Sequence, residues 1–199
     1  MKALIVVDMQ NDFIDGSLAV PRAKEIIDPI NKLMKEGNYD LIVASQDWHP
    51  EGHISFASRY SVKPFTEHNE QIVWPDHCVI GTKGAEISKD INSEYFNMII
   101  KKGFNKNIDS YSALMDSSGK ISGLHEILSP YCDIHVCGLA SDYCVYHTIL
   151  SGVKLLPDNN FYFLDFASRF VDDNNREIVG RTFDSFFVKT IKSPRGENG

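Results

Sequence analysis

The chain has 199 residues, of which 43% are hydrophobic and 24% are charged. This composition excludes a disordered chain and supplies enough apolar side chains for one full core. The 20 Lys and Arg against 27 Asp and Glu give a net charge of −7, with no basic run, so nucleic acid and anionic membranes are poor candidate partners.

The predicted elements alternate between strands and helices. In chain order we predict a strand at 3–7, a helix at 23–37, a strand at 41–44, a helix at 85–93, a strand at 98–100, a helix at 122–129, a strand at 134–137, a helix at 142–150, a strand at 161–164, a helix at 174–183 and a strand at 186–188. The β-α-β start predicts a mostly parallel sheet with right-handed crossovers. No repeat or linker interrupts the pattern, so we expect a single domain over 1–199, with 193–199 as a polar tail.

Apolar runs and cysteines bear on the compartment of the protein. The run at 3–7 is only five residues long before Asp8, too short for a signal-peptide core or a membrane span. The four cysteines are too few and too unevenly spaced for a secreted disulfide scaffold. We therefore expect a cytoplasmic protein with free thiols.

A long irregular segment, residues 47–82, contains four of the seven histidines. Asp47 and His49 stand two residues apart, so on an extended segment both side chains point to the same face. With His53 and His77, they offer oxygen and nitrogen ligands that suit a divalent first-row metal and leave positions open for water or substrate. The alternative is a solvated, histidine-rich loop.

Cys144 follows a short apolar strand and a turn containing Gly138, at the start of a predicted helix. The positive end of a helix lowers the pKa of a thiol, and its N–H groups can bind an oxyanion. These features predict a thiolate nucleophile. The alternative is a buried core thiol, since free cysteine is among the most buried residue types.

Asp8 and Lys102 also stand at the carboxyl ends of predicted strands, the edge at which open α/β sheets carry their chemistry. Asp8 could take the thiol proton of Cys144, and the ammonium of Lys102 would then stabilise both the carboxylate and the thiolate. The alternatives are a turn residue for Asp8 and a solvated surface charge for Lys102.

Three loop aromatics, Phe13, Trp74 and Tyr111, fall on the same edge of the sheet. Such aromatics more commonly serve local packing than ligand binding. If they form a clamp instead, a flat ring is the natural guest.

Five blocks of sequence carry a resemblance to a known family. They are residues 3–20 (ALIVVDMQNDFIDGSLAV), 46–56 with QDWHP and GHISF, 74–82 with WPDHC and GT, 102–113 with KG and DSYSA, and 137–145 (CGLASDYCV). In this order they closely resemble the nicotinamidases of the isochorismatase-like cysteine hydrolase superfamily. The C-terminal third of the chain has no matching motif.

The resemblance implies a Rossmann-like three-layer α/β/α sandwich and an amidohydrolase that converts nicotinamide to nicotinate and ammonia through a cysteine thioester, in NAD salvage. It makes Cys144 the nucleophile, Asp8 the acid and base, and Lys102 the third member of a triad. A cis peptide between Leu139 and Ala140 would let the N–H groups of Ala140 and Cys144 form an oxyanion hole.

The resemblance also implies one divalent metal ion that positions the pyridine ring. Its ligands would be Asp47, His49 and His77, while His53 matches a position that is a ligand in only some members. Zinc is the expected ion, and iron or manganese also suits these ligands. Phe13 and Trp74 would sandwich the ring, with Tyr111 near it.

Two other functions remain open from the sequence. One is an isochorismatase-like amidohydrolase acting on a ureido or N-carbamoyl substrate, and the other is a non-catalytic metal-binding module on the same fold. Relatives with ureido or N-carbamoyl substrates generally lack the DWH and WPDHC ligands, which disfavours the first. The complete set of Asp8, Lys102 and Cys144 disfavours the second. The resemblance leaves a homo-oligomer and the range of pyridine carboxamide substrates open.

Overall fold

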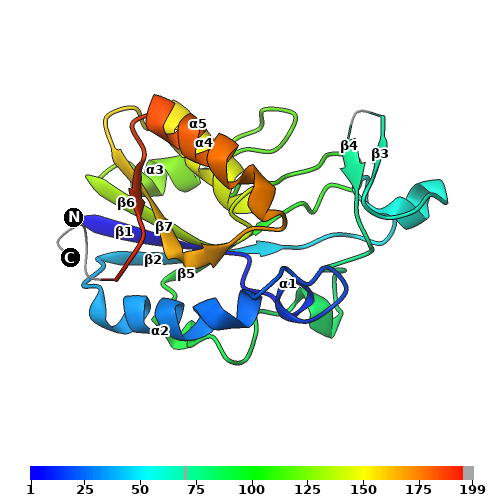
Figure 1. The fold of residues 1–199 in the computed structure, drawn as a ribbon, viewed down its shortest axis with the longest axis horizontal. Helices are drawn as coiled ribbons and strands as arrows, with labels where there is room; N and C mark the ends of the chain where they lie inside the picture. The colour runs from blue at the N-terminus through cyan, green and yellow to red at the C-terminus, as the bar shows by residue number, and fades with distance from the viewer. Residues whose placement is uncertain (70, 195–199) are drawn as a thin grey trace.

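The computed structural model describes residues 1–69 and 71–194, and its main element is a six-stranded sheet in the order β5-β2-β1-β6-β7-β8 (Figure 1). All five strand pairings are parallel. The strands are β1 (Lys2–Val7), β2 (Leu41–Asp47), β5 (Met98–Lys102), β6 (Asp133–Leu139), β7 (Asn160–Arg169) and β8 (Lys189–Ile191). A separate antiparallel hairpin of β3 (Thr66–His68) and β4 (Gln71–Val73) projects at one end of the molecule.

Helices cover both faces of the sheet (Figure 1). On one face lie α1 (Asn11–Ile14) and α2 (Ile27–Glu36), and on the other α3 (Leu124–Leu128), α4 (Cys144–Leu155) and α5 (Arg176–Ser185). Short 3₁₀ segments complete the chain: η1 (Ala23–Ile26), η2 (Ala57–Tyr60), η3 (Lys83–Ala85), η4 (Ser93–Tyr95) and η5 (Asp173–Asn175). The predicted α/β/α sandwich around a mostly parallel sheet is confirmed.

The core consists of two apolar clusters, one on each side of the sheet. Successive side chains of a strand point to opposite faces, so Leu4 and Val6 enter one cluster while Ile5 and Val7 enter the other. This explains why the first strand is a continuous apolar run. The carboxyl ends of β1, β2, β5 and β6 consequently meet at one edge, where the polar residues of interest lie.

Two predicted elements are wrong. The helix at 85–93 is absent: the main chain of residues 86–88 pairs instead with that of residues 9–11, and Ala85 O accepts hydrogen bonds from the amide groups of Gln10 and Gln46. The strand at 186–188 is also absent. Phe187 has a φ of 58° and is 91% exposed, and β8 begins only at Lys189. The second strand extends beyond its predicted end, through Asp47.

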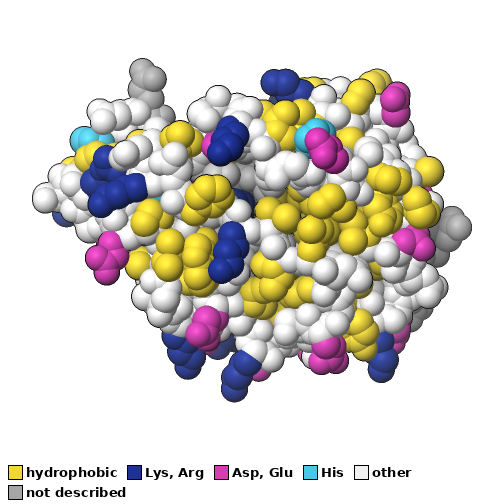
Figure 2. All heavy atoms as spheres, turned by 180° about the vertical axis from the view of Figure 1, so that it is seen from behind, with side chains coloured by type: hydrophobic (Ala, Val, Ile, Leu, Met, Phe, Trp, Pro, Cys, Tyr) yellow, Lys and Arg dark blue, Asp and Glu magenta, His cyan; other side chains and the backbone are white. Residues whose placement is uncertain are grey.

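Four remaining features concern membrane spans, cysteines, the surface and the C-terminal tail. Within the described residues, every helix is too short or too polar to span a bilayer. All four cysteines are free thiols, as expected. Hydrophobic side chains gather across the middle of the face seen in Figure 2, and lysines and arginines lie both among them and toward the edges of the face. Most of the predicted polar tail, residues 195–199, lies outside the described part of the chain.

Candidate active site

Asp8, Lys102 and Cys144 meet in the interior at the carboxyl edge of the sheet. Lys102 is the last residue of β5, Asp8 follows β1 directly, and Cys144 is the first residue of α4. The Lys102 Nζ lies 2.9 Å from Asp8 Oδ2 and 3.3 Å from Cys144 Sγ. All three side chains are buried, with 6% or less of each residue exposed. The structure therefore brings together the three residues that the sequence proposes as a triad.

Two further acceptors surround the same ammonium group. Lys102 Nζ donates to Asp47 Oδ1 at 2.5 Å and to Ser110 O at 3.2 Å. Burial by itself would lower the pKa of Lys102, but the carboxylates of Asp47 and Asp8 outweigh it and raise this pKa well above its usual value. Lys102 is therefore a permanent cation placed between two carboxylates.

Burial also raises the pKa of the Asp8 carboxyl, while Lys102 and a 2.6 Å hydrogen bond from Ser45 Oγ oppose the rise. Burial raises the pKa of the Cys144 thiol well above its ordinary value, and Lys102 only partly offsets this. A lowering by the helix start does not decide the pKa of Cys144, which is raised overall because burial beside Asp8 and Asp47 dominates. A raised pKa favours the neutral thiol of Cys144, and a neutral thiol needs a neighbouring base before it can act as a nucleophile.

The turn before Cys144 has the geometry that the resemblance implies. The Leu139–Ala140 peptide bond is cis. Tyr143 N and Val145 N donate to Ala140 O. Among the described residues, the bonds within this turn do not use the N–H groups of Ala140 and Cys144, which leaves both available to a bound oxygen.

A small pocket opens above Cys144. Its lining includes all three predicted aromatics, two of the metal-ligand candidates, Ala140 and Cys144 with their predicted catalytic roles, and four residues without a predicted role: Phe13, Leu18, Val20, Asp47, Trp74, His77, Tyr111, Ala140, Tyr143, Cys144 and Val171. Trp74 Nε1 donates to the phenol oxygen of Tyr111 (Oη) at 3.0 Å, and the Trp74 ring meets the Tyr143 ring edge-on with 4.9 Å between centroids. The walls are mainly apolar and aromatic, as a flat heteroaromatic ring requires.

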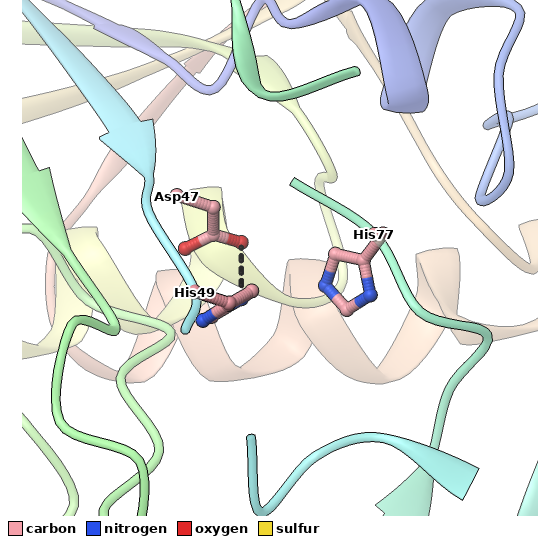
Figure 3. Close-up of side chains that lie close together, drawn as sticks. All are labelled: Asp47, His49 and His77. Carbon is pink, nitrogen blue, oxygen red and sulfur yellow. Dashed lines mark ion pairs between the residues drawn. The ribbon is translucent and has the colours of Figure 1, made fainter. Parts of the chain in front are cut away.

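Asp47, His49 and His77 form a compact group beside this pocket (Figure 3). One possible ligand atom from each lies within 4.8 Å of the others, and His49 Nε2 is 3.5 Å from Asp47 Oδ2. Figure 3 shows Asp47 and His49 at the end of β2, with His77 facing them from another segment. The three come from residues 47–49 and 77, so the fold closes the long irregular loop over its own beginning.

The histidine hydrogen bonds fit a metal ion. Nδ1 of His49 donates to Gly103 O at 2.8 Å, and Nδ1 of His77 donates to Pro75 O at 2.7 Å, because a carbonyl can only accept. Each ring therefore keeps its Nε2 lone pair for a ligand, the usual arrangement of metal-binding histidines. Burial lowers the pKa of His77 to about 4, which favours the neutral form that binds metal. The group can hold a divalent cation.

His53 lies next to this group but outside it. Its Nε2 donates to Ile108 O at 3.3 Å, its Nδ1 contacts Ser55 Oγ at 2.8 Å, and its ring stacks on His49 with 4.1 Å between centroids. Both nitrogens thus have protein partners, and burial lowers the pKa of His53 to about 3. A ligand role for His53 stays a prediction.

Residues without a recognisable sequence signal complete the site. Ser45 bonds Asp8, Gln10 bonds the main chain of Asp47, and Val171 from the unmatched C-terminal third lines the pocket. Gln10 lies in the matched block 3–20, and Tyr143 stands directly before Cys144 in the matched block 137–145, so their positions in these blocks were the signals that the sequence offered.

A buried thiol, carboxylate and ammonium at the edge of a parallel α/β/α sheet define a cysteine hydrolase type of site. The chain belongs to the isochorismatase family, whose isochorismatase-domain model matches residues 2–155.

Within that family, the chain is 42% identical over 182 residues to a nicotinamidase of Acinetobacter baylyi, covering 86% of this chain and 83% of the relative. Its fold matches a structure of an Acinetobacter baumanii nicotinamidase and pyrazinamidase with a TM-score of 0.88 and 37% identity, over 96% of this chain and 95% of the other. A Pyrococcus horikoshii pyrazinamidase in complex with zinc matches with a TM-score of 0.76 and 33% identity, over 96% and 99% of the two chains.

Proposed function

We propose that the chain is an amidohydrolase that converts nicotinamide to nicotinate and ammonia. The observation that carries this proposal is the position of Lys102 Nζ, in contact with both Asp8 and Cys144 beneath a pocket of aromatic walls. The pocket suits a pyridine ring, and the thiol beneath it suits attack on a carboxamide. Relatives named nicotinamidases support the same substrate.

Substrate binding places the ring among Phe13, Trp74 and Tyr111, with the carboxamide carbon beside Cys144 Sγ. Holding the reacting atoms in this arrangement converts a bimolecular step into a unimolecular one and can lower the barrier by several kcal/mol. The aromatic walls also exclude water from the thiol.

In the acylation step, Asp8 accepts the proton of the Cys144 thiol as the sulfur attacks the carboxamide carbon. The N–H groups of Ala140 and Cys144 donate to the oxyanion that forms, and loss of such a donor typically slows catalysis about 10²-fold or more. Lys102 keeps the proton-free Asp8 carboxylate stable. Asp8 then passes the proton to the leaving ammonia, and a thioester remains.

In the deacylation step, Asp8 takes a proton from water as the water oxygen attacks the thioester carbon. The tetrahedral oxyanion collapses, the carbon–sulfur bond breaks, and the proton returns to Cys144 Sγ. Nicotinic acid leaves and loses its remaining proton to solvent to give nicotinate, and the neutral thiol is restored, consistent with the raised pKa of Cys144.

Asp47, His49 and His77 would hold a divalent ion, for which we propose zinc, and iron or manganese also fits these ligands. A zinc-containing relative supports this choice. When bound, such an ion supplies a Lewis acid that can take the pyridine nitrogen as a ligand. The protein itself contributes the orientation of both imidazoles through Gly103 O and Pro75 O.

The test is ammonia release from nicotinamide by the wild type and by Cys144→Ala. We expect the variant to lose turnover while it retains nicotinamide binding. Cys137→Ala is the matched control, because Cys137 is also buried but belongs to the apolar cluster on the opposite face of the sheet from that of Cys144. Substantial turnover by Cys144→Ala would contradict the assignment. Release of ammonia only from ureido or N-carbamoyl compounds would favour the other branch of the family, and none from any of them a non-catalytic module.

A further inference from the structure

Gln10 is a fully buried glutamine, 0% exposed, in the turn between β1 and α1. Its side-chain amide makes three hydrogen bonds. Nε2 donates to Asp47 O at 2.7 Å and to Ala85 O at 2.8 Å, and Oε1 accepts from Asp47 N at 2.7 Å. The side chain therefore engages both main-chain polar groups of Asp47.

This pairing continues the ladder between β1 and β2 after β1 has ended. The paired residues of the two strands run to Val6 and Ala44, and Asp8 N then donates to Ser45 O at 3.3 Å. β1 ends at Val7, before it could pair with Asp47. The side-chain amide of Gln10 instead supplies the N–H donor and the C=O acceptor that the main chain of a neighbouring strand would provide. The peptide groups on both sides of Asp47 are thereby held in place.

The carboxylate of Asp47 is shared between the two halves of the site. Its Oδ1 contacts Lys102 Nζ at 2.5 Å, and its Oδ2 faces His49 Nε2 at 3.5 Å. A rotation of the Asp47 backbone would move this carboxylate with respect to both partners. We infer that Gln10 is a positioning residue, which holds Asp47 in the orientation needed for divalent-metal binding. This inference rests on the metal site of the proposed function.

A purely structural role for Gln10 would be to fasten residues 83–87 to the rest of the fold. Other bonds already do so: Asn11 N donates to Glu86 O at 3.0 Å, and the Gln46 amide donates to Ala85 O at 2.7 Å. Gln46 thus shares the Ala85 contact with Gln10, is also buried at 7% exposure, and makes no side-chain bond to Asp47 among the described residues. Substitution of Gln46 therefore tests the fastening of residues 83–87 without touching the side-chain bonds to Asp47.

The experiment compares Gln10→Met with Gln46→Met, since methionine keeps the length of the side chain and removes its hydrogen bonds. The metal-free proteins are titrated with Zn²⁺ against a competing chelator, and their urea unfolding is measured alongside. We expect Gln10→Met to bind Zn²⁺ about 10–100-fold more weakly, the usual effect of losing a group that orients a ligand. Gln46→Met should stay within about 3-fold of the wild type, below that range.

Equal losses of Zn²⁺ affinity in the two variants, or no loss in either, would overturn the positioning role. If Gln10→Met does not fold, Gln10→Asn against Gln46→Asn repeats the comparison, because asparagine keeps the amide but withdraws it by one methylene. Nicotinamide turnover is measured separately on the wild type. Its failure would reject the proposed reaction, whereas a selective loss of Zn²⁺ affinity in the Gln10 variants would still support this inference.

Discussion

Substitution of Gly103 tests whether the position of His49 controls the metal site. Gly103 follows Lys102 directly, has a φ of 67°, and accepts the Nδ1 hydrogen bond of His49. A Cβ atom built on Gly103 would overlap the His49 ring, coming within 2.6 Å of Nδ1 and closer still to Cε1. Gly103→Ala must therefore displace a buried imidazole or the main chain that holds it.

The magnitude can be separated into two parts by a matched glycine. A left-handed backbone costs an alanine about 1–2 kcal/mol, and overpacking of a buried site adds about 1–3 kcal/mol. Gly119 has a φ of 87° with nothing within 4 Å of its would-be Cβ, so Gly119→Ala carries the backbone part alone. We expect losses of unfolding free energy of about 2–5 kcal/mol for Gly103→Ala and about 1–2 kcal/mol for Gly119→Ala.

The assay is urea unfolding of both variants, together with Zn²⁺ affinity measured against a chelator. Gly103→Ala should weaken Zn²⁺ binding about 10–100-fold, because His49 loses its orienting bond, and Gly119→Ala should leave it unchanged. Equal stability losses with unchanged Zn²⁺ affinity in both variants would refute the proposed link between Gly103 and the metal ligand.

Two other perturbations address the acid and base chemistry and the metal. Ser45→Ala removes the hydrogen bond that lowers the pKa of Asp8, so this pKa should rise further; since Asp8 must be ionised to accept the thiol proton, the acid limb of kcat/KM should move to higher pH. A pH profile whose acid limb stays in place would argue against Asp8 as the base. Removal of the metal by a strong chelator should raise the KM for nicotinamide much more than it lowers the melting temperature, because two apolar clusters on the faces of the sheet form the core, whereas the three ligands lie at the edge of the sheet beside the pocket. Unchanged kinetics after verified metal removal would assign the site a different role.

The main features of the site were predictable because they follow from strand ends. Asp8, Asp47 and Lys102 each close a parallel strand, and parallel strands bring their carboxyl ends to one edge. The apolar run of β1 predicted a strand buried on both faces. The residue that follows such a strand lies at the carboxyl edge of the sheet. The positions of these residues at strand ends predicted that they lie close together. They did not predict the distances between their side-chain atoms.

Other features depend on contacts that no local pattern reports. The segment at 85–93 has a weakly helical sequence, but the distant Gln10 and Gln46 side chains take up Ala85 O. The direction of the Cys144 pKa could not be read from its helix position alone, because it depends on burial and on the nearby charges of Lys102, Asp8 and Asp47. Val171 enters the pocket from a region with no motif, since its contribution is only apolar surface.

The central place of β1 has a consequence for the order in which the chain can fold during synthesis. β1 is made first, yet it pairs with β2 at Leu41–Asp47 on one side and with β6 at Asp133–Leu139 on the other. A nascent chain must therefore carry its most apolar strand with one edge unpaired until the ribosome has passed residue 139. Asp8 reaches its place between Lys102 and Cys144 only after that, so no shorter nascent chain contains a complete site.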